Sequence, residues 1–183
     1  HRVPGNAGSR LTDSSPILLW IRRDLRLNDH PALRAAADSG RPVIPVFVCD
    51  KVVEALGAAP KWRFGLGVQA FRDRLRGIGS DLILRRGAAL DVLRALVRET
   101  GAGAVWWARA YDPSSKDRDT AGKAALKSDR VDARSFAGHL LFEPWSVETQ
   151  EGGFYKVYTP FWNAVKGRDP GDPSAGLRKL TGP

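Results

Sequence analysis

The sequence has 183 residues, of which 43% are hydrophobic and 27% charged, and its formal net charge is +9. This length suits a single domain with a real hydrophobic core, and because no apolar run approaches the roughly 20 residues that span a bilayer, we expect no contact with a membrane. The single cysteine excludes an intramolecular disulfide and any metal site built from several cysteines, and it agrees with the cytoplasmic location that we expect. The basic residues are scattered among 20 acidic ones, so the net charge permits an acidic partner such as nucleic acid without identifying one.

The two ends of the sequence have the composition of irregular segments. Residues 1–16 are rich in Gly, Ser, Thr and Pro, which predicts a flexible lead-in. The sequence contains no methionine and begins with His1, so we expect the gene to start upstream of it. Residues 167–183 combine Gly, Pro and Asp, which predicts a linker to a further domain.

Between these ends, short apolar segments alternate with segments of helical periodicity. Predicted strands cover 17–21, 43–48, 81–85, 104–108 and 131–135. Predicted helices cover 32–38, 62–78, 88–100 and 114–127, and a further helix-like segment covers 159–166. This alternation, with short connections, predicts an α/β fold of the Rossmann-like kind: a doubly wound five-stranded parallel sheet with helices on both faces.

A cluster of charges follows the first predicted strand. Residues 22–26 read Arg-Arg-Asp-Leu-Arg, and Pro31 then opens a helix. Parallel sheets bind ligands at the carboxyl ends of their strands, so the cluster indicates a ligand site there, although any strand ends in something polar. The sequence lacks the glycine-rich loops that hold dinucleotides or nucleotide phosphates, and neither His30 nor His139 has a second ligand at metal spacing, so we predict no metal.

Three segments resemble motifs of the DNA photolyase and cryptochrome family. Residues 20–33 read Trp-Ile-Arg-Arg-Asp-Leu-Arg-Leu-Asn-Asp-His-Pro-Ala-Leu, like the opening signature of that family. Residues 106–119 resemble its segment after the fourth strand, and residues 155–161 resemble its Tyr-x-Val-(Tyr/Phe)-x-Pro-Phe motif. The resemblance covers nearly all of residues 17–166. It implies the N-terminal antenna domain of a DNA photolyase, an enzyme that uses light to split cyclobutane pyrimidine dimers in DNA.

The same resemblance implies the cofactors and partners. An antenna chromophore, namely 8-hydroxy-5-deazaflavin, methenyltetrahydrofolate or a flavin, would bind in this domain. FAD and the damaged DNA would bind in a following helical domain of the same polypeptide, so we expect this chain alone to be inactive, and monomeric. A cryptochrome-type photoreceptor without repair activity shares this domain and is the alternative. A free-standing nucleotide-binding protein ranks below both, because no glycine-rich phosphate loop is present.

Three of the six residues that we predict to hold the chromophore lie around the second strand. Phe47 and Asp50 lie at its end, and Arg63 lies in the first turn of the following helix. An aromatic face with a few polar groups suits a planar, hydrogen-bonding ligand. The alternative for Asp50 and Arg63 is a local surface ion pair of little energetic value.

The other three predicted chromophore residues are Arg23, Asp112 and Ser115. Arg23 belongs to the charged cluster, and Ser115 is a candidate helix cap. Asp112 matches an acid that deazaflavin-binding relatives use, but Ala110 stands where those relatives carry a second acid. Ser114-Ser115 stands where folate-binding relatives carry Asn-Glu. The sequence therefore leaves the identity of the chromophore open.

Overall fold

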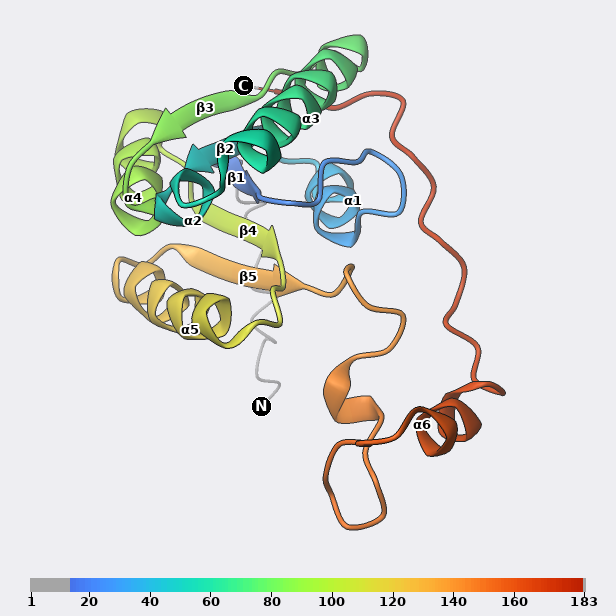
Figure 1. The fold of residues 1–183 in the computed structure, drawn as a ribbon. Coiled ribbons are helices and arrows are strands. Elements are labelled where there is room, and N and C mark those ends of the chain that lie inside the picture. The colour runs from blue at the N-terminus through green and yellow to red at the C-terminus, as the bar shows by residue number, and fades with distance from the viewer. Residues whose placement is uncertain (1–13, 183) are drawn as a thin grey trace, which may run out of the picture.

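The computed structural model describes residues 14–182. Most of the predicted flexible lead-in, residues 1–13, lies outside the described residues. The strands are β1 (Ile17–Ile21), β2 (Val43–Cys49), β3 (Ile83–Arg86), β4 (Ala104–Ala108) and β5 (Asp132–Phe136). They form one parallel sheet in the order β3-β2-β1-β4-β5 (Figure 1), which confirms the predicted five-stranded parallel sheet.

Four of the six helices in the described residues cover the two faces of this sheet, as predicted, and α6 lies apart from it (Figure 1). They are α1 (Pro31–Asp38), α2 (Lys51–Glu54), α3 (Ala58–Gly77), α4 (Ala89–Thr100), α5 (Pro113–Ser128) and α6 (Tyr158–Val165). Helices α1 and α3 pack on one face, and α4 and α5 pack on the other. The short helix α2 was not predicted, and α3 begins four residues before its predicted start.

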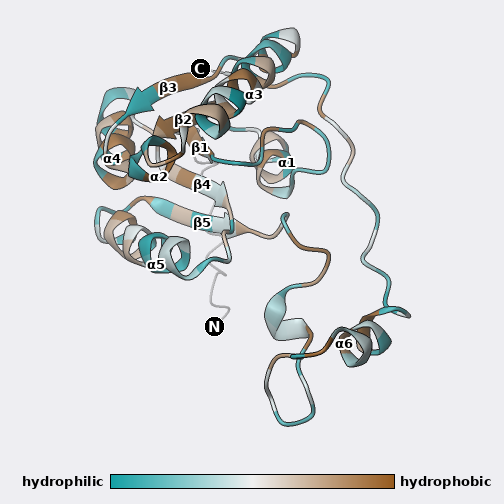
Figure 2. Cartoon of the chain, viewed as in Figure 1, coloured by the Kyte–Doolittle hydropathy of each residue, from teal (hydrophilic) through white to brown (hydrophobic). Residues whose placement is uncertain are grey.

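The core consists of two hydrophobic clusters that the sheet separates. Successive side chains of a strand point to opposite faces, so Ile17 and Leu19 belong to the cluster under α1 and α3, while Leu18 and Trp20 belong to the cluster under α4 and α5. Every residue of β1 is buried because both faces are covered. Figure 2 shows the hydrophobic character of the central strands β2 and β4.

A buried Asp–His pair fixes the turn between β1 and α1. His30 Nε2 lies 2.9 Å from Asp24 Oδ2, and both side chains are 2% exposed. His30 Nδ1 accepts a hydrogen bond from the Leu33 amide at 3.1 Å and so caps α1, while Asp24 Oδ1 accepts one from the Arg22 amide at 2.8 Å. Because Nδ1 is an acceptor, the Nε2 atom of His30 carries the proton that faces Asp24.

This pair predicts a specific pH dependence of stability. Burial raises the pKa of Asp24, but the hydrogen bonds from His30 and the Arg22 amide outweigh it and lower the pKa below its usual value. A carboxylate with a lowered pKa in the folded state stabilises the fold above its unfolded pKa of about 3.9, and this stabilisation is lost as the pH falls through the folded pKa. In denaturant titrations, the stability advantage of the wild type over Asp24→Asn should shrink below about pH 4. An advantage that is constant from pH 7 to pH 3 would contradict this assignment.

The segment after β5 leaves the sheet and later returns to it (Figure 1). Helix α6 lies apart from the sheet, but Leu180 is 2% exposed within the core under α3. The Leu180 amide donates to the carbonyl of Ile78, and the Val43 amide donates to the carbonyl of Thr181, each at 2.9 Å. The stretch that the sequence suggests is a linker is therefore held against the sheet at its end.

Within the described part of the chain, no helix combines the length and the apolar composition needed to cross a membrane.

Candidate functional site

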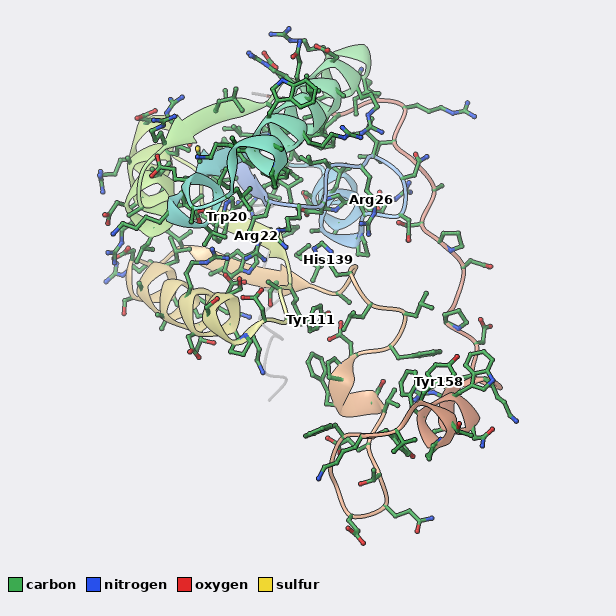
Figure 3. The ribbon with its side chains drawn as sticks, in the orientation of Figure 1. Trp20, Arg22, Arg26, Tyr111, His139 and Tyr158 are labelled. Atoms are coloured by element: carbon green, nitrogen blue, oxygen red, sulfur yellow. The ribbon has the colours of Figure 1, made fainter. Side chains whose placement is uncertain are left out.

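A cavity of about 830 Å³ lies at the carboxyl ends of β1, β2 and β4. The strand order places β2 and β4 on opposite sides of β1, and the crevice beside such a reversal is where doubly wound sheets bind ligands. Figure 3 shows Trp20, Arg22, Tyr111 and His139 gathered at this end of the sheet, between α3 and α5. The volume is that of a site for a small molecule or cofactor.

The two sides of the cavity differ in chemistry. The side toward α2 and α3 is apolar and aromatic; it includes Phe47, Val52, Val53, Leu56, Pro60 and Phe64. The side toward β4 and α5 is polar; it includes Arg22, Arg109, Tyr111, Asp112, Ser115 and Arg118. One face could therefore pack against a flat ring while the other forms hydrogen bonds.

Asp50 connects the two sides. One carboxylate oxygen caps α2 by accepting from the amides of Val52 and Val53 at 3.0 and 3.2 Å, an arrangement that the positive end of a helix favours. The other oxygen lies 3.2 Å from a guanidinium nitrogen of Arg118 on α5. Both oxygens of Asp50 thus have partners before any ligand is considered.

A charged network forms the floor of the cavity around Trp20. Arg22 Nη1 donates to both carboxylate oxygens of Asp119 at 2.9 Å, and its Nη2 donates to the carbonyl of Ala108. Arg118 lies 3.3 Å from the same Asp119 carboxylate. The guanidinium carbons of Arg22 and Arg118 lie 4.7 and 5.2 Å from the centre of the Trp20 ring, within the range of cation–π attraction.

Hydrogen bonds also fix the segment that follows β4. Asp112 caps α5 by accepting from the Ser115 amide and the Ser114 hydroxyl, both at 2.9 Å, and these bonds lower the pKa of Asp112 to about 2. Burial, together with a 2.7 Å hydrogen bond to Glu143, raises the pKa of Tyr111 to about 12. Asp112 is therefore ionised and Tyr111 protonated at neutral pH.

Five of the six predicted chromophore residues line this one cavity: Phe47, Asp50, Asp112, Ser115 and Arg23. Arg63 does not line it and is exposed on α3. The next residue, Phe64, is turned about 100° further around the helix and faces the cavity instead. The local pair of Asp50 with Arg63 does not form either, because Asp50 pairs with Arg118.

Sequence reasoning missed several lining residues, above all Trp20, Phe64, Arg109 and Arg118. Trp20, Arg109 and Arg118 lie inside segments that resemble family motifs, and that resemblance was the only sequence signal for them.

A family model described as DNA photolyase matches residues 17–175, which is most of the chain. The chain belongs to the DNA photolyase family. It is 43% identical over 171 residues to a deoxyribodipyrimidine photo-lyase of Agrobacterium fabrum, covering 93% of this chain and 36% of that protein. It is 34% identical to cryptochrome-1 of Arabidopsis thaliana over 164 residues, covering 87% of this chain and 24% of that protein.

A solved structure supports the same assignment. The crystal structure of a bacterial class III photolyase from Agrobacterium tumefaciens superposes with a TM-score of 0.89 at 42% identity, covering 98% of this chain and 37% of that one. The resemblance inferred from three motifs is thus confirmed, and the fold is that of the photolyase α/β domain. The chain spans little more than a third of the length of these two Agrobacterium proteins.

Proposed function

We propose that this chain is the light-harvesting N-terminal domain of a deoxyribodipyrimidine photolyase. The whole protein would repair cyclobutane pyrimidine dimers in DNA on an FAD held by a following helical domain. The observation that carries this proposal is the cavity at the point where the strand order reverses. The chain is also more similar to the photolyase of Agrobacterium fabrum, at 43% identity, than to cryptochrome-1 of Arabidopsis thaliana, at 34%. A cryptochrome-type photoreceptor is the second candidate, because the chain also matches cryptochrome-1 over most of its length.

The cavity residues fit a planar antenna chromophore. The ring centres of Phe47 and Phe64 lie 5.6 Å apart and form an aromatic surface on one side of the cavity. The cavity volume of about 830 Å³ accommodates a fused ring system. Arg23 is exposed at the cavity and has no acidic partner among residues 14–182, which leaves its charge available to a ligand or to the following domain. When bound, the chromophore would absorb light and pass the energy to FAD. The residues of this chain would orient the chromophore and exclude water from one face of its ring.

Three chromophores are consistent with this description: 8-hydroxy-5-deazaflavin, methenyltetrahydrofolate and a flavin. Asp50 accepts hydrogen bonds at both carboxylate oxygens, whereas Asp112 accepts its bonds from Ser114 and Ser115 at the same oxygen, so ligand polar groups would contact the side where Asp112 lies. Absorption spectra of the whole protein reconstituted separately with each compound would identify the one that binds.

An exposed aromatic surface supports the proposed partner domain. Its centre is formed by Tyr158, Phe161 and Trp162 of α6, which are 37–69% exposed and whose rings contact one another, and Trp145, Phe154 and Val157 nearby in the sequence are also exposed. Tyr158 and Trp162 stack with ring centres 6.4 Å apart and a 7° angle between planes, and α6 buries only Val165. Tyr158 lies well away from the sheet (Figure 3). Exposed aromatic side chains that gather on one helix are typical of an interface, and we assign this one to the following domain.

Replacing Tyr158 and Trp162 together by alanine should weaken the attachment of that domain without unfolding this one. Both side chains are exposed here, so the thermal midpoint of the 183-residue chain should stay within a few degrees. In the whole protein, the double variant should retain less FAD and be cut faster by protease between the domains. Trp62→Ala is the matched control, because Trp62 is 69% exposed on α3, outside this surface. Equal FAD loss in the control would contradict the assignment.

The decisive test of the proposed function is light-dependent repair by the whole protein with reduced FAD. Loss of thymine dimers only under blue or near-ultraviolet light would establish a photolyase. Flavin photoreduction without dimer loss would establish the cryptochrome alternative.

A further inference from the structure

Helix α3 is 20 residues long, but only its second half belongs to the core. In that half, Val68, Phe71 and Leu75 of the helix are buried against the sheet. In the first half, residues 58–67, every residue is exposed except Phe64 and Gly67, which are half-buried. Segments with so few buried apolar contacts open locally at a lower free energy than the core does.

The sequence of this first half weakens it further. Gly57 precedes the helix and provides no capping side chain, and the first turn has no acidic residue to complement the helix dipole. Helix α5, on the opposite side of the cavity, does have a cap, Asp112. Gly65 and Gly67 lie in the interior of α3, where glycine is the least favourable residue apart from proline.

Close packing accounts for one of these glycines but not for the other. A Cβ atom on Gly67 would lie 3.2 Å from Leu25 Cδ1, so the contact with the loop after β1 favours a small residue there. A Cβ atom on Gly65 would meet nothing within 4 Å. Gly65 is therefore a point of backbone freedom that the packing does not require.

This weak half-helix is also a wall of the cavity. Pro60 and Phe64 line the cavity, and the Phe64 ring meets Phe47 edge to face at 5.6 Å. Lys61 Nζ donates to the carbonyl of Glu54 at 2.7 Å and so ties the start of α3 to the end of α2. A movement of the first half of α3 would change the width of the cavity at Phe64.

We propose that residues 58–67 form a hinged wall that closes Phe64 onto a planar ring in the cavity and opens to release it, with Gly65 as the flexible joint. Phe64 is then a positioning residue for the ring. The closure onto a ring depends on the proposed chromophore site, whereas the mobility of residues 58–67 does not depend on it.

Amide hydrogen exchange in the whole protein tests the joint without any ligand. Amides of residues 62–67 should exchange at least tenfold faster than those of residues 69–75. Gly65→Ala should slow exchange in residues 62–67 about fivefold, the usual difference between glycine and alanine in a helix. Gly77→Ala is the matched control, because its added Cβ also meets nothing within 4 Å but lies at the other end of α3. Uniform exchange along α3, or equal effects of the two substitutions, would overturn the proposal.

Ligand binding tests the closure. 8-Hydroxy-5-deazaflavin, methenyltetrahydrofolate and FMN are added separately, and the one that binds should slow exchange in residues 62–67 by at least tenfold. Phe64→Ala should speed its dissociation about tenfold, whereas Trp62→Ala, on the outer face of the same helix, should not. If a compound binds and exchange in α3 is unchanged, the hinge is wrong and the chromophore site stands. If none of the three binds, both the chromophore site and the closure are wrong.

Discussion

Replacing Leu180 with alanine is expected to lower the free energy of unfolding by about 2–5 kcal/mol, the usual cost of truncating a buried leucine. Leu180 is 2% exposed and packs in the cluster under α3, far along the chain from the other members of that cluster. The variant removes this packing while the backbone hydrogen bonds of residues 180 and 181 can still form. Urea denaturation followed by circular dichroism would measure the difference.

Leu141→Ala is the matched control for this experiment. Leu141 is 77% exposed, so its truncation should change the free energy of unfolding by no more than about 0.5 kcal/mol. Equal stability of the two variants would show that residues 174–182 are a dispensable linker. A large loss of unfolding free energy in Leu180→Ala alone would show that the folded domain includes residue 180.

Replacing Arg118 with methionine is expected to damage the cavity more than any other single change in its polar side. Arg118 contacts Asp50, the residue that caps α2, and Asp119 on α5, and its guanidinium lies over the Trp20 ring. Without it, the second oxygen of Asp50 keeps a charge but loses its partner, a loss that costs about 1–3 kcal/mol for a buried group. We expect a comparable fall in stability, and at least a tenfold weaker retention of the chromophore.

Lys116→Met provides the control for Arg118, because Lys116 is exposed on the same helix. It removes the same charge and adds the same side chain without touching the network around Trp20. Chromophore affinity measured by fluorescence titration should fall only in the Arg118 variant. If both variants lose affinity equally, net charge rather than the network explains the effect.

The three inner strands β1, β2 and β4 could be predicted closely because they are short apolar runs, whereas the edge strands β3 and β5 contain charged residues and begin two residues and one residue later than predicted. The prediction of 17–21 and 104–108 matches β1 and β4 to the residue. The start of α3 was harder to predict, because Gly57 and Pro60 are typical of loops. In the structure Pro60 lies in the first helical turn, where its missing amide hydrogen costs no hydrogen bond.

The position of the cavity could be predicted from the sequence, but only some of its lining residues could. Residues at strand ends, such as Phe47 and Asp50, necessarily lie at the same edge of the sheet. Residues on helices depend on rotation about the helix axis, which is why Phe64 rather than Arg63 lines the cavity. The pairing of Asp50 with Arg118 joins residues 68 positions apart, and local sequence patterns contain no information about such a pair.

The return of residues 174–182 to the sheet also determines how force passes through the molecule. The Asp29 amide donates to the Ser174 carbonyl at 2.9 Å, so the chain is tied to the domain again after the excursion that carries α6. Tension on the chain beyond Gly182 would act on the hydrogen bond between Thr181 and Val43, the first residue of β2. The opposite end of that strand carries Phe47, with Asp50 just after it, so such a pull would be transmitted along β2 to two residues that line the cavity.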